Sequence, residues 1–321
     1  MGVNHTILFY SKIIGDEAMN YNNLKEELES ILDINQIRYN ELMKNHTSFK
    51  VGGAADIFIT PNSYNKFIKC LNACKKYNAP YFIMGNGTNL MVRDGGYKGV
   101  IIKLTSLNDI KVEGNRITAD AGALLSKTAN EALKNSLKGL EFASGIPGTV
   151  GGALTMNAGA YGPEMKDVVD CAEVVDENGN RFILNRDQLE LSYRMSAVQK
   201  YNYAILWASF VLEHGEYNQI KDRMDELNKR RVDKQPLEYP SAGSTFKRPD
   251  GYFAAKLIDD AGLKGLSVGG AMVSKKHSGF IINYNNATAK DILELIKKVQ
   301  ELVKEKFGVE LEPEIKLIGE D

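Results

Sequence analysis

The stretch S-G-I-P-G-T-V-G-G-A-L-T-M-N-A-G-A-Y-G, residues 144–162, decides how the rest of the chain is organised. It has too many glycines for an ordinary helix or strand, and it contains no charged residue. Glycine is needed where the backbone takes positive φ or lies close against another group. Pro147 suits the first turn of a short helix whose free N–H groups could meet a phosphate. The stretch therefore predicts a backbone surface that faces a flat or anionic ligand, and a tight interior crossing of two chain segments is the alternative.

The composition is that of an ordinary globular protein, with 43% hydrophobic and 25% charged residues in 321. A chain of this length predicts two or three domains. The 40 basic residues nearly balance the 41 acidic ones, so no overall charge favours nucleic acid or an anionic membrane as a partner. An anionic substrate would have to be met by lysines and arginines gathered locally.

The first residues, M-G-V-N-H-T-I-L-F-Y-S-K, lack the basic region and the apolar run of a signal peptide. No later run is apolar over the length of about 18 residues that would span a bilayer. We therefore expect a cytoplasmic protein. Cys70, Cys74 and Cys171 are predicted to be buried free thiols, and neither they nor the four histidines have metal-ligand spacing, so no metal site is expected.

Hydrophobic periodicity predicts a mixed chain of helices and strands. The predicted helices cover 23–38, 63–77, 124–135, 217–234, 252–261 and 288–307. The predicted strands cover 55–60, 81–84, 90–93, 99–104, 109–113, 116–120, 171–176, 180–184, 204–212 and 309–318. A boundary is expected near residue 215, where the long helix with Ile220, Met224 and Leu227 begins.

The turn G-N-G-T-N, residues 85–89, is a second glycine-rich segment. It follows a strand, but it lacks a third glycine and leads into an apolar, strand-prone run rather than a helix. A dinucleotide-binding Rossmann turn is therefore excluded. Free backbone N–H groups in such a turn can form a concavity that holds an anion. A plain β-hairpin is the alternative, because Asn-Gly is a favoured hairpin dipeptide.

Polar residues in four places require an explanation. Arg194 lies in S-Y-R-M-S, and Ser244 follows a glycine in S-A-G-S-T-F-K-R-P. The serine is not a nucleophile elbow, because G-x-S-x-G is absent, but its hydroxyl could donate a proton or bind substrate. The run K-R-R-V-D-K, residues 229–234, gathers four cations at a helix end. Glu314 alternates with two further glutamates along the last predicted strand, so the three would share one face. Surface loops and solvated faces are the alternative in each case.

Taken in order, these motifs resemble those of the UDP-N-acetylenolpyruvoylglucosamine reductase family, also called UDP-N-acetylmuramate dehydrogenases. The resemblance rests on G-N-G-T-N-L, the stretch 144–162, Y-R-M-S, S-A-G-S-T-F-K and L-E-P-E-I-K-L-I-G, and it covers residues 40–320. It implies an α+β fold of the vanillyl-alcohol oxidase type. The implied domains are two FAD-binding subdomains, 1–105 and 106–215, and a substrate-binding domain, 216–321.

The same resemblance implies a cytoplasmic, monomeric oxidoreductase with non-covalent FAD. It would use NADPH to reduce UDP-N-acetylglucosamine enolpyruvate to UDP-N-acetylmuramate, a step in peptidoglycan synthesis and hence in cell-wall biogenesis, cell shape and cell division. NADPH and the sugar nucleotide would use one pocket in turn. Flavin N5 would deliver hydride to the terminal enolpyruvyl carbon.

Residue roles carry over by motif. The residues implied to hold FAD are Gly85, Asn86, Gly87, Thr88, Asn89, Leu90, Ala121, Gly122, Gly145, Ile146, Pro147, Gly148, Thr149, Gly151, Gly152, Asn157, Ala158 and Gly159. Ser244 would be the proton donor, with Arg194 and Glu314 as the other catalytic groups. The residues implied to contact substrate are Tyr193, Arg231, Lys234, Lys247 and Arg248.

The implied chemistry assigns a task to each catalytic group. Arg194 would hold the substrate carboxylate as negative charge develops beside it. Glu314 would have to be protonated or closely hydrogen-bonded, since a bare carboxylate would oppose that charge. Ser244 would protonate the carbon next to the carboxylate, and Lys247 or a water would replace its proton.

Two departures from the family pattern stand out. Position 248 is arginine where many relatives carry asparagine after F-K, which adds a cation for a carboxylate or phosphate. The short separation of Arg194 and Ser244 indicates the shorter class of the family, without an inserted tyrosine-bearing loop. Tyr193 and Tyr239 are candidates to cap the substrate in its place.

Two other functions compete with this interpretation. A sugar or lactone oxidase on the same flavin fold would often attach FAD to histidine or cysteine, and 144–162 contains neither. A non-catalytic nucleotide-binding module would tolerate replacement of Arg194, Ser244 and Glu314.

Overall fold

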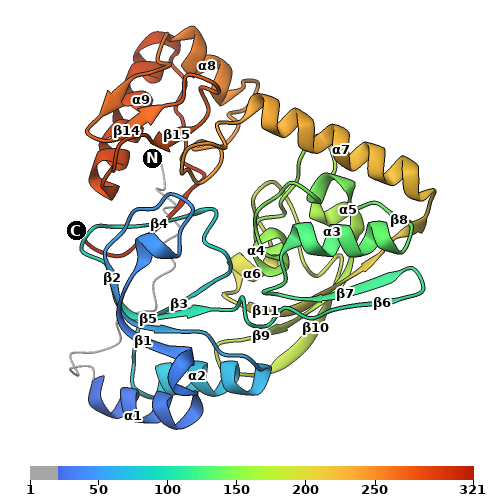
Figure 1. Ribbon diagram of the computed structural model, residues 1–321. Coiled ribbons are helices and arrows are strands. Elements are labelled where there is room, and N and C mark those ends of the chain that lie inside the picture. The colour runs from blue at the N-terminus through green and yellow to red at the C-terminus, as the bar shows by residue number, and fades with distance from the viewer. Residues whose placement is uncertain (1–20) are drawn as a thin grey trace.

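The computed structural model describes residues 21–321, so His5 and the segment examined for a signal peptide lie outside the described residues. Figure 1 shows three groups of elements: a small sheet with two helices below, a larger sheet to the right, and a helical group above. One long helix, α7 (Tyr217–Lys234), leads from the larger sheet to the helical group. No helix in the described part of the chain is long and apolar enough to cross a bilayer.

The first group is a four-stranded sheet with the order β1-β2-β5-β3. Its strands are β1 (Ile37–Leu42), β2 (Ala54–Ile59), β5 (Tyr97–Lys103) and β3 (Tyr81–Met84). Two helices, α1 (Tyr21–Ile31) and α2 (Tyr64–Lys76), lie together beside it (Figure 1). The Ser63 side chain accepts from the N–H of Lys66 and caps α2, as predicted from the sequence.

The predicted helix over 23–38 is wrong beyond Ile31. Asp33 forms a capping box with Gln36 and starts a short 3-10 turn, and the chain then becomes β1. This strand pairs antiparallel with β2. Apolar spacing alone did not reveal β1, because its backbone hydrogen bonds depend on a strand that comes later in the chain.

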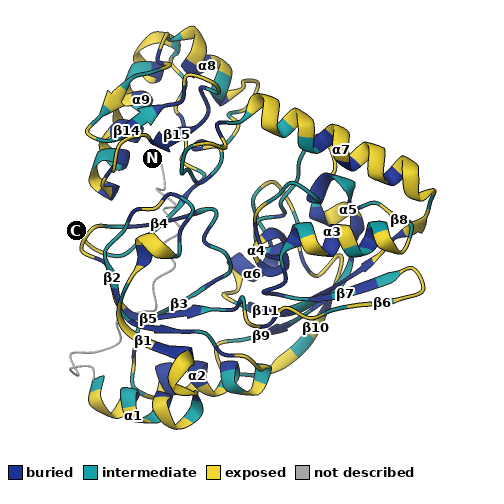
Figure 2. Ribbon diagram, viewed as in Figure 1, coloured by how far each residue is buried: buried dark blue, intermediate teal, exposed yellow. Residues whose placement is uncertain are grey.

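The second group is a five-stranded antiparallel sheet with the order β10-β9-β11-β7-β6. Its strands are β10 (Arg181–Asn185), β9 (Val169–Val175), β11 (Ala204–Val211), β7 (Arg116–Asp120) and β6 (Ile110–Glu113). The helices and short strands around it are α3 (Leu125–Lys134), α4 (Val150–Thr155), α5 (Met165–Val168), α6 (Ala197–Lys200), β8 (Leu137–Lys138) and β12 (Glu213–His214). The predicted strands 109–113 and 116–120 pair as one hairpin, and the predicted strands 171–176 and 180–184 pair as another. The central strands are buried (Figure 2).

The three cysteines are free, but they are not equally buried. Cys70 and Cys74 lie on the covered face of α2 and are fully buried, as predicted. Cys171 is only partly buried, which corrects the prediction for that residue. It lies in β9 opposite Asn185 and Ser209, and a residue in a strand faces the core only if its alternation places it there.

The third group packs two helices against a small sheet. Its elements are α8 (Ala254–Asp260), β13 (Ser267–Val268), β14 (Ala271–Val273), β15 (Ile281–Asn283) and α9 (Ala289–Phe307). The predicted ends of α9 are confirmed: Thr288 forms a capping box with Asp291, and Gly308 ends the helix with φ 70°. Asp94, from the first group, accepts hydrogen bonds from the N–H groups of Ala289 and Lys290 at the same helix start.

The end of the chain returns to the first group. Strand β16 (Lys316–Ile318) pairs in parallel with β4 (Leu90–Val92), directly after the turn 85–89. The predicted closing strand over 309–318 is therefore confirmed only at its end. Three glutamates do not share a strand face: Glu310 pairs with Lys304, Glu312 pairs with Lys247, and Glu314 is turned inward.

Candidate active site

The two glycine-rich segments form one wall. The Asn86 side-chain amide donates to the carbonyl of Pro147 at 3.0 Å. A Cβ atom on Gly85 would lie 2.2 Å from the Thr149 hydroxyl oxygen, so that contact requires glycine. The turn 85–89 is not a hairpin, because β3 pairs with β5 and β4 pairs with β16. It connects two sheets and lies against the stretch 144–162.

The anion-binding groups of this wall differ from those predicted. Helix α4 begins at Val150 with Thr149 as its cap, so Pro147 precedes the helix instead of occupying its first turn. The first N–H groups of α4 are already used, by the carbonyls of Ala123 and Ala121 and by the Thr149 hydroxyl. The short helix therefore offers no free N–H groups to a phosphate.

The free donors lie in the loops instead. Within residues 21–321, the backbone N–H groups of Asn86, Gly87, Gly148 and Thr149 donate no hydrogen bond. They come from two segments that touch each other. Neighbouring unpaired amides of this kind form a concavity for an anion. The residues thus fit a dinucleotide held at its pyrophosphate, through the loops and not through a helix end.

Gly152 provides a second indication of a ligand. It lies in α4, is exposed, and a Cβ atom there would meet only the Thr149 hydroxyl at 3.5 Å. Alanine would therefore fit, and it favours a helix by about 1 kcal/mol over glycine. By contrast, a Cβ atom on Gly151 would lie 2.9 Å from that of Ala121. Packing explains Gly151, whereas a flat ligand against the helix would explain Gly152.

This difference yields a prediction with effects of opposite sign. Gly152→Ala is expected to raise the free energy of unfolding of the FAD-free protein by about 1 kcal/mol, through helix propensity. The same variant is expected to bind FAD more weakly, because its methyl group occupies the ligand's surface. Denaturant unfolding of the apoprotein and titration with FAD measure the two effects. Unchanged FAD affinity would mean that no ligand lies against Gly152.

Other residues assigned to FAD from the sequence have contacts within the protein. A Cβ atom on Gly122 would lie 1.8 Å from the carbonyl oxygen of Leu104, so packing requires that glycine. The buried Asn157 amide donates to Glu164 and to the carbonyl of Ser192. Asn157 thereby holds the loop that carries Arg194.

Arg194 lies in a tight turn with a backbone conformation that is rare for arginine. Its φ is +56°, and Ser192 and Met195 exchange backbone hydrogen bonds around it. Gln199 donates to the Arg194 carbonyl at 3.0 Å. Non-glycine residues in this region cost about 1–3 kcal/mol and cluster at functional sites. The turn directs the guanidinium toward the end of the chain.

The partner of Arg194 is Glu314. The Arg194 Nε atom lies 2.6 Å from Glu314 Oε1, and both side chains are largely buried. Burial raises the pKa of Glu314 above that of an ordinary glutamate, although Arg194 and Lys247 oppose this shift. The pair joins residues 120 positions apart in the sequence. The structure thus brings together two of the three predicted catalytic groups.

Ser244 is linked to this pair through its neighbour Thr245. The Glu314 N–H donates to the carbonyl of Thr245 at 2.8 Å. Ser244 itself is exposed, follows Gly243 at φ +79°, and makes no side-chain hydrogen bond within the described residues. Asn89, from the glycine-rich turn 85–89, donates to the Glu314 carbonyl at 3.2 Å. Glu314 thereby connects the glycine-rich turn with the segment of Ser244.

A cavity of about 230 Å³ lies between the stretch 144–162 and the end of α7. It is lined by Phe142, Gly145, Ile146, Gly159, Ala160, Tyr161, Leu227, Asn228, Arg231, Lys234, Gln235 and His277. Burial lowers the pKa of Arg231, and no carboxylate of residues 21–321 pairs with it. Two lining residues, Tyr161 and His277, were missed in the sequence. The guanidinium of Arg230 lies 4.8 Å from the Tyr161 ring centre, a contact that sequence spacing does not reveal.

Four further residues expected at the substrate have different contacts. The Tyr193 hydroxyl accepts from the Arg248 N–H at 3.0 Å, and the Arg248 guanidinium lies 3.9 Å from the Phe253 ring centre. Tyr193 thus contacts the third group of elements. Tyr239 packs instead beside Tyr284, with ring centres 5.4 Å apart. The Lys247 ammonium pairs with Glu312.

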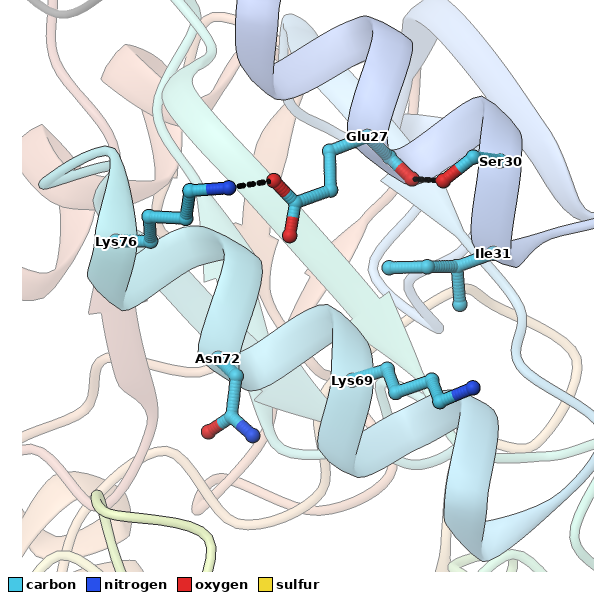
Figure 3. Close-up of a pocket in the computed structure, with 6 residues that line it drawn as sticks. All are labelled: Glu27, Ser30, Ile31, Lys69, Asn72 and Lys76. Carbon is cyan, nitrogen blue, oxygen red and sulfur yellow. Dashed lines mark hydrogen bonds and ion pairs between the residues drawn. The ribbon is translucent and has the colours of Figure 1, made fainter.

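A second hollow lies on the surface between α1 and α2, away from these residues (Figure 3). Glu27, Ser30, Ile31, Lys69, Asn72 and Lys76 line it. Glu27 and Lys76 pair across the two helices, and all six lining residues lie within α1 or α2 and not in the glycine-rich loops. It is not part of the candidate active site.

Comparisons with known proteins agree with this geometry. Residues 55–185 match the FAD binding domain family, and residues 235–318 match the UDP-N-acetylenolpyruvoylglucosamine reductase, C-terminal domain, family. The UDP-N-acetylenolpyruvoylglucosamine reductase of Clostridium novyi (strain NT) is 58% identical over 93% of this chain and 97% of its own length. The chain belongs to the UDP-N-acetylenolpyruvoylglucosamine reductase family. This membership confirms the family, the oxidoreductase class and the FAD cofactor predicted from the sequence.

Solved structures give the same result for the fold. The UDP-N-acetylenolpyruvylglucosamine reductase of Thermus caldophilus is 35% identical and covers 88% of this chain and 99% of its own, with a TM-score of 0.76. A glucose dehydrogenase, wild-type Phl p 4.0202, shares only 13% identity, covers 89% of this chain and 58% of its own, and has a TM-score of 0.50. The latter likeness concerns the fold alone. The predicted α+β fold of a reductase with an FAD-binding part and a C-terminal domain is confirmed.

Proposed function

We infer that the chain catalyses the FAD-dependent, NADPH-driven reduction of UDP-N-acetylglucosamine enolpyruvate in peptidoglycan precursor synthesis. The observation that carries this inference is the pairing of Arg194 with Glu314 beside the loop of Ser244, next to the glycine-rich wall. FAD, when bound, supplies the hydride that NADPH has delivered to it. The remaining tasks are binding, orientation and proton delivery, and they belong to side chains of this chain.

The wall of unpaired amides would hold the FAD pyrophosphate. The N–H groups of residues 86–87 and 148–149 come from two segments that contact each other through Asn86 and Pro147. Their positions are fixed before the ligand arrives, so binding requires little rearrangement. We also propose the division into subdomains 1–105 and 106–215 and a domain 216–321, in which β16 of the last domain pairs with β4 of the first subdomain.

Arg194 would bind the carboxylate of the substrate. Its Nε is engaged by Glu314, which leaves the terminal N–H groups of the guanidinium for a second carboxylate. An arginine in a dry site stabilises negative charge that develops during reaction more strongly than it would in water. The strained backbone of Arg194 agrees with a residue that is held in place for this task.

Glu314 and Ser244 would take part in protonating the substrate. A protonated Glu314 adds no negative charge next to the substrate carboxylate and can donate a hydrogen bond to it. Ser244 has an unpaired hydroxyl on an exposed position beside this pair. A serine in that place can transfer its proton to the carbon that carries the carboxylate, and a water from solvent can replace it.

The nucleotide end of the substrate would occupy the cavity at the end of α7. Arg231 and Lys234 line it, and Arg231 has no carboxylate partner within residues 21–321. An unpaired, partly buried arginine is suited to a diphosphate. The Tyr161 ring beside Arg230 offers an apolar surface at the same cavity.

The raised pKa of Glu314 gives a prediction for pH dependence. A carboxyl group whose pKa is raised is protonated below that value and loses its proton as the pH rises through it. The rate of flavin reoxidation by substrate is expected to fall as the pH rises through this raised pKa. Stopped-flow absorbance of the flavin measures the profile. Glu314→Gln cannot ionise, so its profile should lack this decline; the same decline in the variant would assign it to another group.

The function itself is tested by a spectrum of the purified protein. The protein should show the visible absorbance of a flavin, and NADPH should bleach it without oxygen. Addition of UDP-N-acetylglucosamine enolpyruvate should then restore the colour. Bleaching by a free sugar in place of NADPH, with the colour restored by oxygen but not by the enolpyruvyl nucleotide, would instead identify an oxidase on the same fold.

A further inference from the structure

The loop that carries Ser244 is anchored at both ends inside its own part of the chain. The Pro240 carbonyl accepts from the N–H of Asn283 at 2.9 Å, and the Thr245 N–H donates to the Gly279 carbonyl at 2.9 Å. Between these anchors, Ser244 is exposed. The position of Ser244 relative to the glycine-rich turn 85–89 therefore depends on a contact between its loop and the first group of elements.

Ser48 provides such a contact. Its hydroxyl Oγ donates to the carbonyl of Ser241 at 2.7 Å, three residues before Ser244. The same Oγ also lies 3.5 Å from the Gly87 carbonyl oxygen and 3.4 Å from that of Thr88. The Ser48 backbone N–H donates to the Gly87 carbonyl at 3.0 Å, within the same glycine-rich turn. No other side chain from residues 21–105 donates a hydrogen bond to the loop 240–245. One residue thus touches both the turn at the flavin side and the loop of the proton donor.

The segment around Ser48 is itself held firmly. Phe49 is fully buried and Val51 nearly so, and both belong to the core formed by α8, α9 and the small sheet. The Asn283 side chain donates to the Phe49 carbonyl at 3.1 Å. Since Asn283 also anchors Pro240, the segment and the loop share one support. The Ser48 hydroxyl therefore extends from a backbone segment whose place is set by buried neighbours.

We propose that Ser48 is a positioning residue for proton transfer by Ser244. This inference rests on the proposed function. The hydroxyl has one proton and donates it over the short distance to Ser241, which fixes the loop against the turn that holds the flavin. Reduction of the enolpyruvyl group requires hydride and proton to arrive at adjacent carbons in a defined geometry. A displacement of about 1 Å from such a geometry can cost about 10²-fold in rate.

The test removes the Ser48 hydroxyl and leaves the backbone hydrogen bond of that residue in place. Ser48→Ala retains the N–H bond to Gly87, so FAD content and the rate of flavin reduction by NADPH should remain those of the parent protein. Flavin reoxidation by the enolpyruvyl nucleotide should slow by about 10–100-fold, with little change in the substrate concentration at half saturation. Ser48→Thr retains a hydroxyl and should restore most of the rate. Equal losses in both half-reactions, or no rescue by threonine, would overturn the proposal.

A double variant separates positioning from a general loss of structure. If Ser48 acts through Ser244, adding Ser48→Ala to Ser244→Ala should slow reoxidation no further. A further loss equal to that of the single variant would show that Ser48 acts independently and would overturn the proposal. Reoxidation that is slow in Ser244→Ala and unchanged in Ser48→Ala would refute the role of Ser48 alone. Unchanged reoxidation in Ser244→Ala would refute the role assigned to Ser244.

Discussion

Ser244→Ala is expected to slow reoxidation of the reduced flavin by the enolpyruvyl substrate by about 10²–10⁴-fold, which is the range for loss of a general acid. Reduction of the flavin by NADPH should be unaffected, because that step needs no proton from this residue. The hydroxyl has no hydrogen-bond partner within residues 21–321, so its removal leaves no buried group unpaired. Stability and FAD content should therefore remain those of the parent protein.

Single-turnover stopped-flow measurements distinguish the two half-reactions. Ser267→Ala is a suitable control, since it removes an exposed serine hydroxyl from β13. Ser244→Cys supplies a more acidic group at the same place and should recover part of the rate. If Ser244→Ala reoxidised as fast as the control, another group would have to deliver the proton.

Arg194→Lys is expected to slow the same half-reaction by about 10²–10³-fold, as removal of one preorganised donor to developing charge does in other enzymes. Lysine keeps the charge but loses the planar fork, which contacts Glu314 and would bind the substrate carboxylate in the proposed mechanism. The lost contact should also raise the pKa of Glu314 further, since Arg194 is the main group that opposes its raised value. The decline of the pH profile should accordingly move to higher pH.

Arg223→Lys is the matched control for this variant, because Arg223 is an exposed, ion-paired arginine of α7. Surface ion pairs of this kind contribute little, so the control should retain the activity and stability of the parent. An effect of Arg194→Lys on NADPH oxidation equal to that on substrate reduction would contradict a role at the substrate carboxylate. A profile that moved to lower pH would contradict the pairing with Glu314.

Local signals in the sequence predicted most elements of the fold. Ser63 and Thr288 cap helices, and Gly308 ends one, because these residues satisfy backbone groups within a few positions of themselves. The absence of a third glycine excluded a Rossmann turn at 85–89 for an equally local reason. The motifs themselves were specific enough to identify the family, which the relatives then confirmed.

Contacts between distant segments were decided by the tertiary structure. Strand β1 was not predicted, and its first two residues were assigned to the preceding helix, because the hydrogen bonds that stabilise the strand come from its partner β2. The turn 85–89 was compatible with a hairpin until β4 was seen to pair with β16 from the other end of the chain. Likewise, the N–H groups of α4 were expected to be free, but the carbonyls of Ala121 and Ala123 accept from two of them.

The candidate active site shows the same distinction between local signals and contacts between distant segments. The sequence by itself predicted which side chains carry chemistry and that a glycine-rich backbone faces a ligand, because residue type and backbone freedom are local properties. Only the tertiary structure decided that Arg194 meets Glu314, that burial raises the pKa of that glutamate, and that Ser48 reaches the loop of Ser244. These features depend on burial and on distances between segments that the chain brings together only when it folds.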